Sequence, residues 1–403
     1  MQVISSSLSP NTEREDVLEA LRVLCNPASW QKGSAIDEVE KWFNGVSFDS
    51  GRSALFALLQ TFDIRQGDEV LMQAFTCVAV PNSIHLAGGL PVYVDIDDTF
   101  NIDPKDLEKK ITKRSKAIIV QHTFGVPARM DAILAIAKKH KLIVIEDCAH
   151  SLGATYLPAG KAGKGKKIGT LGDAAFFSFG RDKVISSVWG GMATISQKFP
   201  RSGIQLRGTK VKSQKLREFQ ENLPYPSRAW IAQQLFHPIA FSVILPTYNM
   251  VIGKIMLEAF KRMRLLSIPN PPSFYPKRYP NALATLLLKQ LAKLEKYNET
   301  RRDIASYYRK ELKKGTLDNG AIYLRFPVLV DNPVGVMRQA KKQGILLGNW
   351  YYNVIDPKGV DLKVVGYIRG SCPNAETAAE HIINLPTLIT KQDAREVICS
   401  LTG

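Results

Sequence analysis

Four side chains that can do chemistry lie at or just beyond the ends of apolar runs. Asp147 ends the run LIVIED, and His150 follows three residues later. Ser178 and Lys183 flank the end of a second run, AAFFSF. Upstream, Gly51 to Ser53 open a helix-forming stretch, and small residues at a helix start leave backbone N–H groups free for a phosphate. Ligands of open parallel sheets bind beyond the carboxyl ends of the strands, so we expect these residues to share one crevice.

A lysine, a carboxylate, a hydroxyl and a helix N-terminus are together the groups that a pyridoxal 5′-phosphate (PLP) enzyme requires. The lysine binds the cofactor and moves a proton, and the carboxylate keeps the pyridine nitrogen protonated, because the pyridinium is the electron sink. Each residue alone has a plainer explanation. A lysine is usually a solvated surface charge, and Asp147 or Ser178 can satisfy backbone groups at a strand end. Their order and spacing together favour the PLP interpretation.

The elements that must position these residues alternate between strands and helices from about residue 50 to 195. The clearest unit is an apolar strand over 116–123, an amphipathic helix over 130–140 and an apolar strand over 142–147. Apolar runs of this length joined by a helix predict a βαβ unit in a mainly parallel sheet that helices cover on both faces. Further strands are predicted over 69–72, 91–97, 174–179 and 192–196, and further helices over 53–63, 81–88 and 104–111.

Length and composition predict two domains and an anionic partner. The chain has 403 residues, of which 45% are hydrophobic and 23% charged, so it can bury a large core. Its net charge of +17 suits an anionic small substrate or an anionic surface, and without a zinc-finger or RNA-binding signature no nucleic acid is expected. Five cysteines without a CxxC pair indicate reduced thiols and no metal site. The N-terminus lacks a signal-peptide pattern, so we expect a cytoplasmic protein.

Residues 229 to 253 hold no Lys, Arg, Asp or Glu, and aromatic residues recur along them. Aromatic side chains of this kind favour the lipid–water interface, and the basic residues that follow can meet anionic headgroups. Prolines and amides interrupt the run, so a full membrane span is not predicted. We expect a shallow amphipathic or re-entrant hairpin over 229–266, peripheral to the inner face of the membrane. The alternative is that the segment packs against the rest of the protein or forms a dimer contact.

The C-terminal part predicts a smaller α/β domain. A long helix over 283–312 is apolar at helical spacing and charged on its opposite face. A strand over 321–330 and helices over 334–344 and 376–383 follow. We therefore divide the chain into a cofactor-binding large domain (1–228), an apolar and basic insert (229–275) and a small domain that includes the long linking helix (276–403).

Several stretches carry a family resemblance. The most specific are IEDCAHSLGATY (145–156) and IGTLGDAAFFSFGRDK (168–183). The others are SGRSAL (50–55), GDEVLMQAFTCVAVPNSI (67–84), GGLPVYVDIDDTFNIDP (88–104), KAIIVQHTFGVPARMDAI (116–133), GGMATIS (190–196) and CPNAETAAEHIINLPT (372–387). Together they resemble the DegT/DnrJ family of PLP-dependent nucleotide-sugar aminotransferases, which belongs to the fold-type-I, aspartate aminotransferase-like group. The resemblance covers most of the chain except roughly 198–275.

The resemblance implies a role for each candidate residue. Lys183 would carry PLP as a Schiff base, and Asp147 would pair with the pyridine nitrogen. His150 would contact the phenolic oxygen of the ring, and Ser178 would bind the phosphate together with backbone groups of residues 51–53. A dehydratase branch of the family replaces the lysine with histidine, so Lys183 argues against that branch.

Three positions depart from the family's pattern. Arg52 stands where the family usually has threonine, although a guanidinium can also bind phosphate. Cys77 stands where members usually place an aromatic residue that stacks on the PLP ring, so either another group covers that face or the ring is held more loosely. The Asn-x-Arg motif, which often reaches a neighbouring subunit's active site, is poorly kept, because Arg278 matches but Pro276 replaces the asparagine. Whether this motif reaches the active site of a neighbouring subunit therefore stays open.

The resemblance implies an aminotransferase (transaminase) that moves an amino group from an amino acid, glutamate, to a keto sugar on a nucleotide or lipid carrier, as in polysaccharide biosynthesis. It also implies a homodimer with active sites at the subunit interface. Two alternatives stay open: another fold-type-I PLP reaction, such as a lyase or desulfurase, and a catalytically silent, membrane-associated regulatory protein. Retention of Asp147, His150, Ser178 and Lys183 argues against the silent scaffold, which has no physical need of that set.

Overall fold

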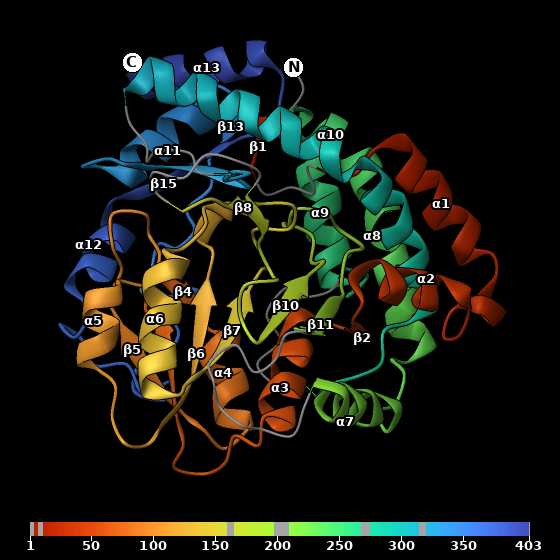
Figure 1. Cartoon of the computed structure of the whole chain (residues 1–403). Helices are drawn as coiled ribbons and strands as arrows, with labels where there is room; N and C mark the ends of the chain where they lie inside the picture. Colours follow the sequence, from red (N-terminus) through yellow and green to blue (C-terminus); the bar gives the residue numbers. More distant parts are fainter. Residues whose placement is uncertain are drawn as a thin grey trace.

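A seven-stranded sheet forms the centre of the protein (Figure 1). The computed structural model describes residues 4–6, 11–158, 165–196, 209–266, 275–313 and 320–402. The strands follow the order β2-β11-β10-β7-β6-β3-β5, in which β11 is antiparallel to both neighbours and the other pairs are parallel. Their bounds are β2 Val46–Phe48, β3 Glu69–Gln73, β5 Leu90–Val94, β6 Ser115–Gln121, β7 Ile143–Asp147, β10 Ala174–Ser178 and β11 Gly191–Ile195.

Both faces of this sheet are apolar because side chains alternate along each strand. In β6, Ile118 and Val120 join one core, whereas Ala117 and Ile119 join the other. Burial of both faces explains the continuous apolar runs in the sequence and confirms the predicted α/β fold class. The first core is packed by α1 (Arg14–Leu24), α2 (Ser34–Phe43), α5 (Pro104–Lys109), α6 (Met130–His140) and α10 (Asn281–Leu312), the second by α3 (Gly51–Thr61), α4 (Ala79–Leu86), α7 (Thr209–Glu221) and α12 (Pro373–His381).

A separate apolar core holds the small domain together. Strands β12 (Arg325–Leu329) and β15 (Ile382–Pro386) pair antiparallel and pack with α11 (Pro333–Lys342), α13 (Lys391–Thr402) and the end of α10. Residues 376–383, predicted as one helix, divide instead between α12 and β15, because the apolar β-branched pair Ile382–Ile383 begins the strand.

Two short strand pairs tie the small domain to other parts of the chain. Strand β1 (Ile4–Ser5) pairs with β13 (Ile345–Leu346), so these N-terminal residues lie against the C-terminal part of the chain. Strand β14 (Ile355–Asp356) pairs with β4 (Thr76–Cys77) and brings a small-domain segment beside Cys77. The remaining pair is β8 (Thr155–Tyr156) with β9 (Lys166–Lys167).

The predicted insert forms a helical hairpin, in which α8 (Arg228–Thr247) and α9 (Ile252–Arg262) lie side by side (Figure 1). Side chains of Phe241, Ile244, Leu257 and Phe260 pack between them. Most of the apolar surface of α8 is therefore buried, as the packing alternative expected. Among the described residues, no helix is long and apolar enough to span a membrane. Residues 267–274 of the predicted insert lie outside the described residues.

A buried carboxylate fixes the loop that leads into β10. Glu146 accepts hydrogen bonds from three backbone N–H groups, those of residues 169, 171 and 172, at 2.6 to 2.9 Å, and contacts Nε2 of His122 at 3.2 Å. Within the described ranges, Glu146, His122 and Cys148 form the one cluster whose residue types resemble metal ligands. Because donors already occupy the carboxylate oxygens, we interpret the cluster as structural.

Replacing Glu146 with alanine should strongly destabilise the protein. The change removes the acceptor of two buried N–H groups, those of residues 171 and 172, and of the part-buried N–H of residue 169. Each buried group costs about 1–3 kcal/mol, so the free energy of unfolding should fall by at least about 2 kcal/mol. Urea unfolding of Glu146→Ala and of a surface control, Glu108→Ala, measures the difference. Equal unfolding midpoints for the two variants would show that Glu146 does not hold this loop.

Candidate active site

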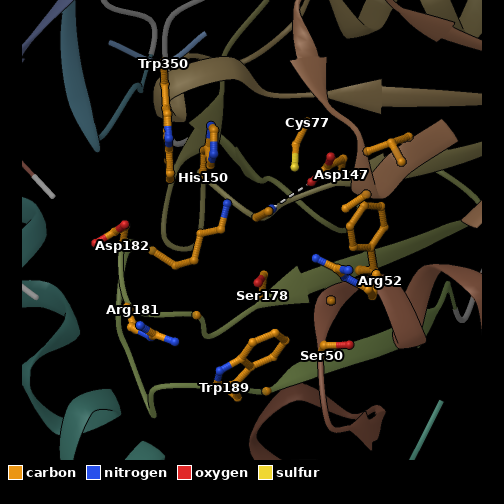
Figure 2. A pocket seen from close by; sticks show the side chains of 18 of the residues that line it. Ser50, Arg52, Cys77, Asp147, His150, Ser178, Arg181, Asp182, Trp189 and Trp350 are labelled. Atoms are coloured by element: carbon orange, nitrogen blue, oxygen red, sulfur yellow. Dashed lines mark hydrogen bonds between the residues drawn. The ribbon is translucent and has the colours of Figure 1, made fainter. Parts of the chain in front are cut away.

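A cavity of about 440 Å³ lies at the carboxyl ends of β7 and β10 (Figure 2). Cavities of this size hold a cofactor together with a small substrate. Its walls come from the large domain, from α8 and from the small-domain segment 350–356. Of the residues predicted for the site, those that line it are Gly51, Arg52, Cys77, Asp147, His150, Ser178 and Lys183. The sequence prediction therefore placed most of its candidates around one space.

Burial shapes the charges of Asp147 and Lys183. Phe176 of β10 pairs with Asp147 of β7, so these two strands bring Asp147 and the loop that carries Lys183 to the same edge of the sheet. Burial lowers the pKa of Lys183 below its ordinary value, and the carboxylate of Asp147 acts in the opposite direction. Burial also raises the pKa of Asp147, although the Ala149 N–H, at 3.0 Å, and Lys183 oppose the shift. The amine is thereby moved toward its neutral, nucleophilic form.

His150 is held as a neutral imidazole. Its Nδ1 accepts the backbone N–H of Phe124 at 3.3 Å, which leaves the proton on Nε2, and Nε2 faces the hydroxyl oxygen of Tyr351 at 3.3 Å. Burial lowers the pKa of His150 well below its ordinary value, and the charges of Lys183 and Arg325 act in the same direction. His150 therefore presents a fixed N–H rather than a positive charge to this part of the site.

The start of α3 lies directly against the end of β10. Ser50 caps the helix, its hydroxyl accepting the N–H of Ser53. A Cβ at Gly51 would stand 2.8 Å from the Cβ of Ser178, so glycine permits this close approach. Ser53 does not line the cavity; its hydroxyl donates to Asp49 at 2.6 Å. The helix N-terminus and the Ser178 hydroxyl make a suitable phosphate site.

These residues fit PLP. A buried lysine with a lowered pKa suits covalent attachment of an aldehyde, and the helix start beside Ser178 suits a phosphate. Asp147 is a buried carboxylate whose pKa burial raises, so a cationic N–H group bound in the cavity would stabilise its ionised form. The amine, the phosphate-binding helix start and the carboxylate therefore match the aldehyde, the phosphate and the pyridinium of the cofactor.

Trp350, an aromatic residue from the C-terminal part of the chain, also lines the cavity. The ring of Trp350 stacks on His150 at a centroid distance of 5.1 Å and an interplanar angle of 9° (Figure 2). The Nζ of Lys183 lies 4.8 Å from the centroid of the same ring. Sequence reasoning missed Trp350, although the aromatic run WYY at 350–352 was a visible signal. It also missed the lining residues Tyr351, Asp356, His237 and Phe241, which arrive from the small domain and α8.

Arg278, the retained half of the Asn-x-Arg motif, makes contacts within its own chain. Its backbone N–H donates to Pro224, and it bridges to Phe48 at the edge of the sheet. Its guanidinium lies 4.7 Å from the centroid of the Tyr225 ring.

Several curated proteins are similar to this chain in sequence. The chain is 41% identical over 192 residues to a GDP-perosamine synthase of Caulobacter vibrioides, a match that covers 45% of this chain and 48% of that protein. A pleiotropic regulatory protein of Geobacillus stearothermophilus is 30% identical over 358 residues, 85% of this chain and 79% of that protein. Apart from the latter, the chain spans about half the length of the curated relatives it matches, including SpsC, a spore coat polysaccharide biosynthesis protein of Bacillus subtilis.

The fold is similar to that of a putative sugar aminotransferase from Streptococcus pneumoniae in its PLP form. The TM-score is 0.74 at 20% identity, over 97% of this chain and 96% of that one. The DegT/DnrJ/EryC1/StrS aminotransferase family matches residues 11–224 and 275–402 and skips 225–274, so the resemblance extends further, to residue 224, than the sequence motifs indicated. These two matched ranges make up most of the chain. The chain belongs to the DegT/DnrJ/EryC1/StrS aminotransferase family.

Proposed function

We propose that this protein is a PLP-dependent aminotransferase that acts on a keto sugar. An amino acid, glutamate, gives its amino group to the carbonyl carbon of a sugar on a nucleotide or lipid carrier, and a 2-oxo acid and an amino sugar result. The observation that carries the proposal is the convergence of Lys183, Asp147, His150 and Ser178 on one cavity beside the start of α3. A catalytically silent scaffold has no physical need of this arrangement.

Each residue has a defined task in this proposal. Bound PLP supplies the electron sink that makes the hydrogen on the substrate carbon acidic. With the cofactor bound, the Nζ of Lys183 would be the group that removes this proton from the substrate carbon and carries it during the transfer. Asp147 places a negative charge in a buried setting where it stabilises positive charge. Ser178 and the N-terminus of α3 hold the phosphate, and the stacked rings of His150 and Trp350 exclude water from one wall.

Borohydride reduction of the yellow protein should fix PLP on Lys183 alone, because the pKa of this buried amine is lowered. Glutamate without a second substrate should convert the wild-type protein to its amine form, which separates a transaminase from a lyase or desulfurase. The Lys183→Ala variant should neither retain PLP covalently after borohydride treatment nor convert to the amine form with glutamate. Peptide mapping and absorbance spectra measure both results. PLP fixed on another lysine would contradict the assignment.

Replacing Asp147 with asparagine should weaken PLP binding and remove most activity. A hydrogen bond to a charged group contributes about 1.5–3 kcal/mol, so the dissociation constant of PLP should rise roughly ten- to a hundredfold, with a further loss in turnover from the weaker electron sink. The surface variant Asp131→Asn is the matched control. Near-normal turnover of Asp147→Asn would rule out the role.

We also propose a homodimer and a peripheral membrane contact. Family membership supports the dimer. For the membrane contact, the supporting feature is the α9 stripe, which we define as Ile252, Ile255, Ala259 and Met263. These residues recur at helical spacing and are exposed, Ile255 to 65%. Of the five charged residues between 252 and 264, four are basic and only Glu258 is acidic. An exposed apolar stripe with a basic surround suits a shallow contact with anionic lipid.

Flotation with vesicles that contain phosphatidylglycerol tests the membrane contact. Wild-type protein should float with the vesicles, and a variant with Ile252→Ser, Ile255→Ser and Met263→Ser should not. A control with Val364→Ser and Ile368→Ser, which are exposed elsewhere, should float like the wild type. Wild-type protein that remains unbound would remove the membrane contact. A stripe variant that instead turns a dimer into a monomer would identify the stripe as a subunit interface.

A further inference from the structure

One wall of the cavity comes from a segment that the family match skips. His237 and Phe241 of α8 line the cavity, and both fall within 225–274. They are four residues apart, so they lie on the same helix face, with ring centroids 4.3 Å apart. Lys183, Asp147 and Ser178 lie instead in the parts that match the family. This wall therefore lies outside the ranges that the family model matches, apart from the residues that we propose for catalysis.

The loop that carries Lys183 continues this wall. Arg181 and Trp189 of that loop also line the cavity, on the side away from Cys77 (Figure 2). The Trp189 ring packs edge-on against Trp230 of α8 at 6.0 Å. Side chains of α8 and of this loop are thus in contact beside the cavity.

The chemistry of this wall suits a sugar. Phe241 lines the cavity with part of its aromatic side chain, against which the C–H groups of a pyranose ring can pack. Burial lowers the pKa of His237 well below its ordinary value, and the positive charge of Arg181 adds to this effect. His237 is therefore a neutral imidazole, which can hydrogen-bond to hydroxyl groups as donor or acceptor. Arg181 adds a positive charge that suits the diphosphate of a carrier.

We propose that the α8 wall, His237 and Phe241, contacts the acceptor sugar on its diphosphate carrier and sets which sugar is accepted. The inference rests on the proposed aminotransferase function. Both substrates must bring their reacting carbon to Lys183, but an amino acid is short, whereas a carrier-linked sugar extends further along the cavity. Changes in the α8 wall therefore alter the reaction with the sugar and leave the reaction with glutamate largely intact.

Two half-reactions of the same PLP-bound protein separate these effects. Transamination is reversible, so glutamate and an amino sugar each convert the PLP form to the amine form, with the same absorbance change. The sugar probes are GDP-perosamine and dTDP-3-amino-3,6-dideoxy-α-D-galactopyranose, which are named in the activities of two curated relatives. Phe241→Leu keeps an apolar side chain and His237→Asn keeps a polar one. Val243→Ala, on the exposed side of α8, is the matched control.

The expected result is a selective loss. Phe241→Leu and His237→Asn should slow the reaction with the better amino sugar about tenfold or more, because single pocket contacts contribute about 1–3 kcal/mol to discrimination. The rate with glutamate should stay within about twofold, and Val243→Ala should match the wild type in both. Thermal melting of each variant separates a changed contact from a damaged fold.

Other outcomes overturn the inference in recognisable ways. Equal losses with glutamate and with the sugar would show that the wall shapes the whole cavity. Unchanged rates with both would show that the wall touches neither substrate. Wild-type protein that reacts with glutamate but with neither amino sugar would remove a diphosphate-linked sugar as the occupant and leave the aminotransferase intact. Failure with glutamate itself would overturn the proposed function instead.

Discussion

Removal of Lys183 and Asp147 from water is the constraint on which the site depends. Desolvation lowers the pKa of the lysine and raises that of the carboxylate, so burial disfavours the charged form of both groups. A bound ligand of complementary charge would offset this effect. The sheet makes this possible because its covered faces place two strand ends in a dry interior. The same burial keeps His150 neutral. The protonation states of the site follow from its place in the fold more than from any single contact.

Local patterns predicted much of this arrangement. The apolar runs predicted β6 and β7 within one or two residues of their observed bounds, and the predicted bounds of α6 agree at both ends. These predictions succeed because the hydrophobic pattern of a strand or helix repeats within a short stretch of sequence. Asp147, His150, Ser178 and Lys183 followed from motif spacing. The positions of Trp350 and Asp356 in the cavity wall could not be predicted in this way. They depend on the pairing of β14 with β4, which joins segments far apart in the chain. No local pattern encodes such a pairing.

The α8–α9 hairpin shows that composition alone does not say which part of a segment is buried. Uncharged residues 229–253 resemble a membrane-facing run, yet in α8 they have three separate neighbours, namely α1, α9 and the cavity. The exposed apolar residues gather instead on α9, where basic residues accompany them. A long apolar helix can bury most of its surface within a protein when each of its faces packs against a different neighbour.

Asn11 connects the loop that carries Lys183 to α10 by hydrogen bonds. Its side chain donates to the carbonyl of Lys183 at 2.8 Å and accepts from Arg301, while its own carbonyl accepts from Gln290 and Tyr297 of α10. The backbone of the lysine loop is thus clamped by a residue 172 positions earlier in the chain, outside the cavity lining. A mutational scan for activity would mark position 11 as sensitive, and a map of sensitive positions would therefore outline the clamp as well as the cavity.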